Sequence, residues 1–168
     1  MKTLLALSLL FGLFGCDNER PQGAFKMYEY TYSGTMAYPI RYYCVEKNAE
    51  SGEVTLAWCS DDPEVKIIRV DSGLPDQIDS LVREYKLWRL KDAYRPPVRV
   101  LDGYGWSLRV RYEQNTISSH GSNAWPGPHL RTGFDSVNNL LEELIGAATE
   151  ADIIDRQPYH KFRDDRDR

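Results

Sequence analysis

The sequence is poor in the residues and motifs by which metal and catalytic sites are usually recognised. It contains three cysteines and three histidines among 168 residues. There is no Cys-x-x-Cys pair and the histidines are scattered, so we expect no metal and no cofactor. A Gly-x-Ser-x-Gly elbow and a glycine-rich phosphate loop are also missing. These absences exclude motif-based assignment to zinc proteins, α/β-hydrolases and nucleotide-binding proteins.

Positive charge is also in short supply. The chain has 21 basic and 25 acidic residues, a formal net charge of −4. Nucleic-acid-binding domains normally carry a basic surface, so we expect no nucleic-acid partner. A length of 168 residues, with 42% hydrophobic and 27% charged residues, is typical of one globular domain with its own core.

The longest apolar stretch lies at the N-terminus. Residues 4–14 are mostly apolar and follow a single positive charge at Lys2, which is the layout of a signal peptide. As a helix this stretch would rise only about 16 Å, too little to span a hydrocarbon core of about 30 Å. The sequence Leu13-Phe14-Gly15-Cys16 resembles a bacterial lipobox. The resemblance implies cleavage before Cys16 and a lipid anchor on that residue in the bacterial cell envelope.

The alternative is an ordinary secretory signal in which Cys16 is a chance residue. In either case the loss of Lys2 leaves 20 basic and 25 acidic residues, a net charge of −5. The sequence does not say which membrane would hold the protein.

Four segments follow from this interpretation. We expect a signal peptide at residues 1–15 and a lipidated cysteine with a flexible tether at 16–25, because the tether is polar and contains Pro and Gly. A single domain is predicted at residues 26–155, and a charged flexible tail at 156–168.

Within the domain, period-2 patterns predict strands and period-3.6 patterns predict helices. The expected strands are residues 26–33, 40–47, 53–60, 64–70, 98–101, 106–112 and 116–120. The expected helices are residues 75–90 and about 134–145, with a loop at 121–133 and a short helical turn within 147–154. This order, ββββ-α-ββ-α, predicts an α+β fold. We expect a single antiparallel sheet of about five to six strands, with two amphipathic helices packed on one face.

Besides Cys16, two cysteines remain, both on predicted strands. If Ser51-Gly52 forms a two-residue turn, Cys44 lies directly opposite Cys59. Such a pair is within disulfide reach, and an exported chain meets an oxidising compartment. The alternative is two small buried thiols. The pairing register of the two strands decides between a disulfide and two free thiols, because a loop one residue longer would place the two sulfurs on opposite faces.

Two local motifs stand out, Asp102-Gly103-Tyr104-Gly105-Trp106 and Gly121-Ser122-Asn123-Ala124-Trp125-Pro126. Their order resembles that of a group of small uncharacterised bacterial domains, which carry Asp-Gly-x-x-Trp at a strand start and Gly-x-Asn-Ala-aromatic-Pro before a helix. The resemblance covers about residues 28–145. It implies one α+β domain and no established activity.

The two motifs have two physical interpretations. In the first, their turn-forming residues join a strand start to the loop that enters the last helix. In the second, Asp102, Ser122, Asn123 and Trp125 converge on a pocket for a small ligand or sugar, because an aromatic wall with a few polar groups suits such a site.

Catalysis is a third possibility for this region. Asp102 and His120, together with Ser118, Ser119 or Ser122, supply the residue types of a hydrolytic triad. Ser119 and His120 are neighbours on a strand and would point to opposite faces. The tyrosines at 28, 30 and 32 either form an edge strand that binds a polypeptide or glycan, or pack in the sheet against the helices.

We therefore predict an uncharacterised lipid-anchored envelope protein whose domain is a non-catalytic binding or structural module. Its expected contacts are the membrane, through lipid on Cys16, and a protein or envelope glycan partner. The alternative function is a small hydrolase that uses Asp102 and His120.

Overall fold

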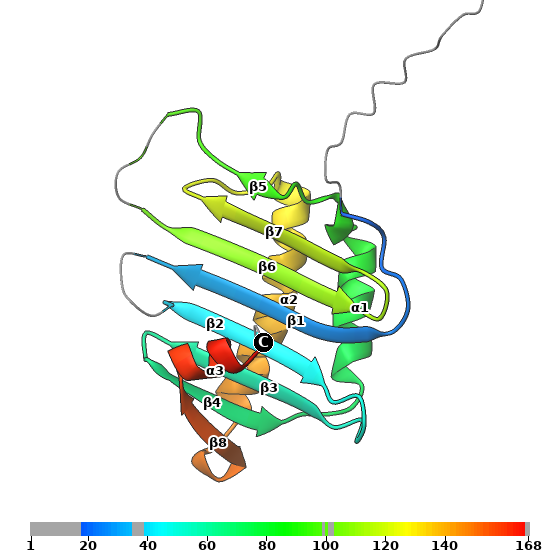
Figure 1. Ribbon diagram of the computed structural model, residues 1–168, viewed down its shortest axis with the longest axis vertical. Helices are drawn as coiled ribbons and strands as arrows, with labels where there is room; N and C mark the ends of the chain where they lie inside the picture. Colours follow the sequence, from blue (N-terminus) through cyan, green and yellow to red (C-terminus); the bar gives the residue numbers. More distant parts are fainter. Residues whose placement is uncertain (1–17, 35–38, 99, 101–102, 167–168) are drawn as a thin grey trace, which may run out of the picture.

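The computed structural model describes residues 18–34, 39–98, 100 and 103–166. One eight-stranded sheet runs through the domain in the order β5-β7-β6-β1-β2-β3-β4-β8 (Figure 1). The α+β class and the single sheet are confirmed. The predicted strand count is too low, and the sheet is mixed because β5 pairs with β7 in parallel while the other pairs are antiparallel.

The strands are β1 Phe25–Ser33, β2 Arg41–Lys47, β3 Val54–Ser60, β4 Glu64–Arg69, β5 Ala93–Tyr94, β6 Gly105–Tyr112, β7 Thr116–Ser122 and β8 Ile153–Pro158. The helices are α1 Leu74–Glu84, α2 Pro128–Ala147 and α3 Tyr159–Arg166, with short 3₁₀ turns η1 Leu87–Arg89 and η2 Glu150–Asp152.

The strand β1 lies in the middle of the sheet, between β2 and β6. Tyr28 and Tyr30 are 0% and 5% exposed, in the core beneath the helices, while Tyr32 is half-buried at the strand end. The packing interpretation of the tyrosines is therefore confirmed for the first two. The predicted edge strand is wrong, because β2 and β6 pair with the two edges of β1.

Helices α1 and α2 pack on one face of the sheet (Figure 1). The first helix ends before residue 90 because Lys86 adopts a left-handed conformation, φ +54°, before η1. The second begins at Pro128, so the predicted loop is wrong from there on. A Cβ on Gly133 would lie 2.5 Å from Tyr85 Cβ and 2.8 Å from Leu87 Cδ2. Gly133 therefore lets the helix approach its neighbour closely and does not interrupt it.

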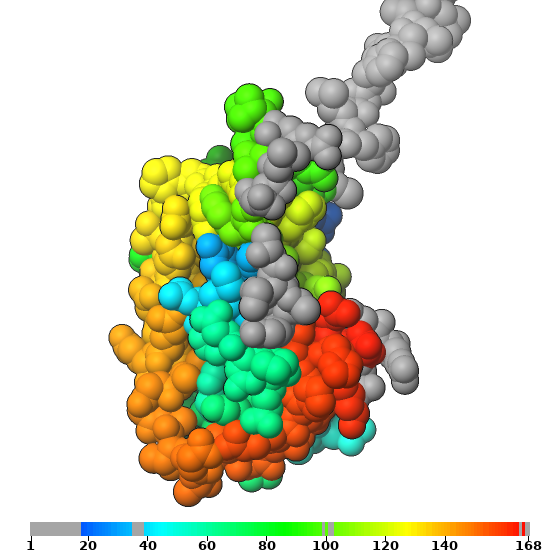
Figure 2. All heavy atoms as spheres, turned by 90° about the vertical axis from the view of Figure 1, so that its left-hand side faces the viewer, coloured from blue at the N-terminus to red at the C-terminus, as the bar shows by residue number. Residues whose placement is uncertain are grey.

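The C-terminal residues form a strand and a helix, although their alternating charges predict a flexible tail. The expectation of a flexible tail from residue 156 is wrong for residues 156–166, which belong to β8 and α3. Phe162 is 7% exposed and packs edge-on against Tyr42, with ring centroids 6.0 Å apart. This places α3 on the sheet face opposite α2, as the turned view shows (Figure 2).

The two cysteines face α3. The loop between β2 and β3 holds six residues, 48–53, so the register pairs Cys44 with Ala57 and Cys59 with Tyr42. The predicted two-residue turn is wrong, and the cysteines are diagonal neighbours on one face instead of an opposite pair. Both are free thiols in the structure, and burial raises the pKa of each to about 12.

The segment predicted as a tether lies against the domain from Asn18 onward. Its backbone and side chains bond to the turn between β6 and β7, where Asn115 Nδ2 donates to the Arg20 carbonyl at 2.9 Å. Cys16 and the predicted signal peptide lie outside the described residues. Among those that are described, no helix is long and apolar enough to cross a membrane.

Candidate functional site

The two sequence motifs meet at the start of β6. The backbone N–H of Asn123 donates to the Tyr104 carbonyl at 2.9 Å, and the Tyr104 N–H donates to Asn123 Oδ1 at 3.0 Å. Asn123 holds a left-handed φ of +51°, which asparagine tolerates better than most residues. A Cβ on Gly103 would lie 1.7 Å from Asn123 Oδ1. This asparagine therefore fastens the strand start to the loop.

The indole of Trp106 makes a second connection between the motifs. Its Nε1–H donates to the Ala124 carbonyl at 2.7 Å. A Cβ on Gly121 would lie only 2.1 Å from Trp106 Nε1, so the glycine leaves the space through which the indole reaches the loop. Both connections support the structural interpretation of the motifs.

Trp125 lies in a layer of aromatic rings on the helix side of the sheet. It stacks on Trp106 at a centroid distance of 5.6 Å and an angle of 4°, and on Tyr104 at 5.5 Å. Tyr32 lies 6.1 Å away, and the Arg131 guanidinium lies 4.4 Å from the Trp125 ring centroid. The rings of Tyr32, Tyr104 and Trp125 are only partly buried. They form the aromatic cluster, a half-exposed patch at this end of the sheet.

Two of the polar residues predicted to share a pocket with Trp125 line a groove on the other face of the sheet. Ser122 and His120 are exposed on the opposite face of β7, where they line a groove of about 420 Å³ with Asn123 and the segment 95–98 and 100. Ser122 and Asn123 therefore line one groove, and Trp125 is not among its lining residues. Asp102 lies outside the described residues, so its part in the pocket stays a prediction.

The serines expected of a hydrolase are divided between the two faces of β7. Ser119 is 3% exposed and its hydroxyl donates to the Lys91 carbonyl at 2.6 Å. This hydroxyl therefore has a structural role. Ser118 and Ser122 share the exposed face with His120. Since Asp102 is not described, the hydrolase hypothesis stays a prediction without a geometric observation in its favour.

A charged site that sequence analysis missed lies on the sheet face that carries α3. A groove of about 290 Å³ is lined by Arg109, Arg111 and Arg166, with Met27, Glu29 and Glu46. Arg111 Nη2 lies 3.0 Å from Glu46 Oε1, and Arg166 Nη2 lies 2.7 Å from Glu46 Oε2. Arg109 Nε lies 3.6 Å from Glu29 Oε2. We call these six residues the arginine groove.

A buried tyrosine holds one carboxylate of the arginine groove in place. The Tyr42 hydroxyl donates to Glu29 Oε1 at 2.9 Å. Burial, together with the charge of this carboxylate, raises the pKa of Tyr42 far above its ordinary value, so the hydroxyl remains a donor. Glu29 is therefore held between a phenol and a guanidinium, which orients Arg109 on the surface.

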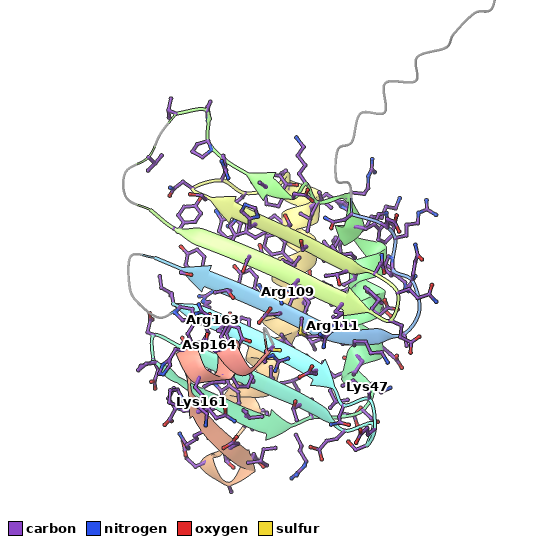
Figure 3. The ribbon with its side chains drawn as sticks, viewed as in Figure 1. Lys47, Arg109, Arg111, Lys161, Arg163 and Asp164 are labelled. Atoms are coloured by element: carbon purple, nitrogen blue, oxygen red, sulfur yellow. The ribbon has the colours of Figure 1, made fainter. Side chains whose placement is uncertain are left out.

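The arginine groove presents positive charge to solvent. The side chains of Arg109 and Arg111 are 49% and 47% exposed, whereas those of Glu29 and Glu46 are 16% and 35% exposed. Figure 3 places Lys161, Arg163 and Asp164 on α3 and Lys47 at the end of β2. A neighbouring groove of about 550 Å³ shares Arg111 and Glu46 and adds the basic residues Lys26 and Lys47 and the acidic residues Glu53 and Glu113.

The sequence pattern predicts part of the arginine groove. The alternation of residues 106–112 puts Arg109 and Arg111 on the outer face of a strand. Arg166 could not be found, because it lies in a segment whose charges predict a tail.

No group of three or more His, Cys, Asp or Glu side chains is placed to hold a metal ion in the part of the chain that the structure describes. Comparison of the sequence with models of known protein families finds no match, and comparison with curated proteins finds none. The resemblance of the two motifs and of the lipobox therefore stays a prediction.

Proposed function

We propose that the chain is a lipid-anchored cell-envelope protein whose domain is a non-catalytic binding module for an acidic protein partner. The observation that carries the proposal is the uncovered part of the sheet around the arginine groove. Helices α1 and α2 occupy the opposite face, and α3 packs only over the strands beyond β6, beside Tyr42 and Val65. None of the helices in the described part of the chain covers the outer faces of β6 and β7 (Figure 1).

Charge favours an acidic partner. Arg109 and Arg111 are more exposed than the carboxylates they contact, so the surface that a partner meets is positive although the whole chain carries a net charge of −4. Complementary charge on the partner would speed association and exclude wrong partners.

The shape and composition of this face favour a protein over a glycan. Among the outward residues of β6 and β7, none is Phe, Trp or Tyr. Their side chains are mostly hydroxyls and guanidinium groups, with His120 the one ring. Arginine is enriched in protein interfaces, whereas a sugar site usually needs aromatic walls. The aromatic cluster remains the place where a glycan would be expected instead.

The test uses photo-crosslinking in membranes of the native host, followed by binding measurements. A crosslinker at Ser107, on the outer face of β6, is expected to capture a partner that a crosslinker at Thr132 on α2 does not. With the identified partner purified, the variant Arg109→Gln/Arg111→Gln is expected to bind at least about tenfold more weakly, because charged pairs across an interface are worth about this much or more.

The matched control is Trp125→Ala in the aromatic cluster, with folding of each variant checked by circular dichroism. Retained affinity is expected for this control. If Trp125→Ala abolishes binding and the arginine variant binds normally, the partner uses the aromatic cluster and the proposed site is wrong.

A further inference from the structure

The first described residue, Asn18, is clamped to the edge of the sheet. Its Nδ2 donates to the Leu90 carbonyl and to the Ser118 carbonyl, each at 2.9 Å, and its Oδ1 accepts from the Ser118 N–H at 2.9 Å. The short strand β5 pairs with β7 only at His120 and Gly121. The amide of Asn18 therefore takes the place of a strand partner at Ser118.

This clamp fixes where a lipid on Cys16 would lie. Cys16 precedes Asn18 by two residues, and two residues of chain reach at most about 7 Å. A lipid at that position would hold the β7 edge of the domain close to the bilayer. No long flexible tether would separate them.

The surface next to Asn18 is basic. Residues 86–95 contain Lys86, Arg89, Lys91 and Arg95, all exposed, and a single acidic residue, Asp92. Within the described residues, none of the four basic side chains takes part in an ion pair. The segment therefore carries a net charge of +3 in a chain whose total is −4.

The same end of the molecule also presents apolar side chains. Three large hydrophobic residues in the described part of the chain are exposed, and two of them are Val98 at 69% and Val100 at 45%. Pro96 and Pro97 precede them. The Arg20 guanidinium lies 5.9 Å from the ring centroid of the half-buried Trp88. Figure 1 shows this segment extending beyond the β5 edge of the sheet.

We propose that this end of the domain rests on an anionic lipid surface, with Val98 and Val100 inserted at the headgroup level and the cations Lys86, Arg89, Lys91 and Arg95 among the phosphates. The inference rests on the lipid attachment at Cys16 in the proposed function. Basic residues next to a bilayer are attracted by anionic lipids, and this attraction adds to the anchoring by lipid on Cys16. The lipid and the protein surface together make a double contact.

The test places an environment-sensitive fluorophore on Val98→Cys in the full, lipidated chain, reconstituted into vesicles of mixed zwitterionic and anionic phospholipid. The buried thiols of Cys44 and Cys59 do not compete for the label. The matched control is Ala49→Cys, exposed in the β2–β3 loop at the other end of the sheet. A lipid-borne quencher is expected to quench the probe at position 98 severalfold more strongly than the probe at position 49.

Charge is tested separately from lipid attachment. Quenching at position 98 is expected to fall severalfold in the variant Lys86→Glu/Arg89→Glu/Lys91→Glu and on purely zwitterionic vesicles. Equal quenching on both vesicle types would overturn the anionic contact. If the chain stays with the vesicles but neither probe is quenched, the docked orientation is wrong and the lipid anchor stands. If mass spectrometry finds no lipid on Cys16 and the chain leaves the vesicles, the proposed anchoring fails as well.

Discussion

Replacing Phe162 with alanine is expected to release α3 from the sheet while the rest of the domain stays folded. Phe162 is 7% exposed and contacts Tyr42, and the Arg166 guanidinium lies 4.9 Å from its ring centroid. Truncating a buried Phe to Ala typically costs about 3–5 kcal/mol, and a terminal helix of eight residues relaxes easily, so we expect about 3 kcal/mol. Because α3 is short and terminal, this loss is expected as local opening before global unfolding.

Thiol chemistry reports this opening directly. Cys44 and Cys59 are 1% and 2% exposed in the cluster that Phe162 closes, and burial raises the pKa of each to about 12. At pH 8 the thiolate fraction of such a group is about 10⁻⁴, whereas at the ordinary pKa of about 8.5 it is about a quarter. In a Cys16→Ser background, Phe162→Ala is therefore expected to speed modification of both thiols by at least about a hundredfold.

The control is His160→Ala, an exposed position on the same helix, which should leave the rate unchanged. A Phe162→Ala chain whose thiols react at the parental rate would refute the packing of α3 over this cluster. It would also remove Arg166 from the arginine groove.

Three further predictions concern the core. Gly121→Ala is expected to lower the free energy of unfolding by about 2 kcal/mol, because the added Cβ collides with Trp106 Nε1. The control Gly146→Ala, where a Cβ meets open space on α2, is expected to be neutral or stabilising. Urea denaturation measures both variants. Asn138→Leu is expected to lower the free energy of unfolding by about 1–3 kcal/mol, because it removes the acceptor 2.8 Å from the buried Tyr28 hydroxyl. In a double-mutant cycle, adding Tyr28→Phe is expected to recover part of this loss. Burial raises the folded-state pKa of Cys44, and burial together with the hydrogen bond to Asp79 raises that of Tyr112. The stability that these two groups contribute is therefore present below their unfolded pKa values of about 8.5 and 10, and it is lost as pH rises through the folded values. A melting temperature that stays constant from pH 9 to 11 would contradict this.

Strong periodicity predicted the elements that build the core. Trp106, Leu108 and Val110 alternate with exposed residues on β6 as the sequence indicates. The first four strands fall within one residue of their predicted ranges at each end. Burial on one face imposes such periods, so they can be recognised without knowledge of the partner element.

The missed features depend on contacts that a periodic pattern does not show, some between distant residues and some within one loop. Gly133 looks like a helix breaker until Tyr85 is placed against it. The register of the cysteines depends on Asn48, whose Oδ1 accepts from the N–H groups of Glu50 and Ser51 and so stabilises a six-residue loop. Helix α3 has mainly Phe162 and Tyr159 to bury, too few apolar residues to give a period.

The two proposals use adjoining surfaces, because Val98 and Val100 line a groove with His120 and Ser122 of β7. The sheet runs from β5 at one edge to β8 at the other, and the basic and apolar segment lies at the β5 edge while the arginine groove lies on the face. If the β5 edge rests on the bilayer, the sheet stands away from the membrane and its uncovered face points along the surface. A partner on β6 and β7 would then approach from the side, close to the lipid headgroups. This geometry favours a partner that is itself held at the membrane, because confinement to one surface raises the effective concentration of both proteins.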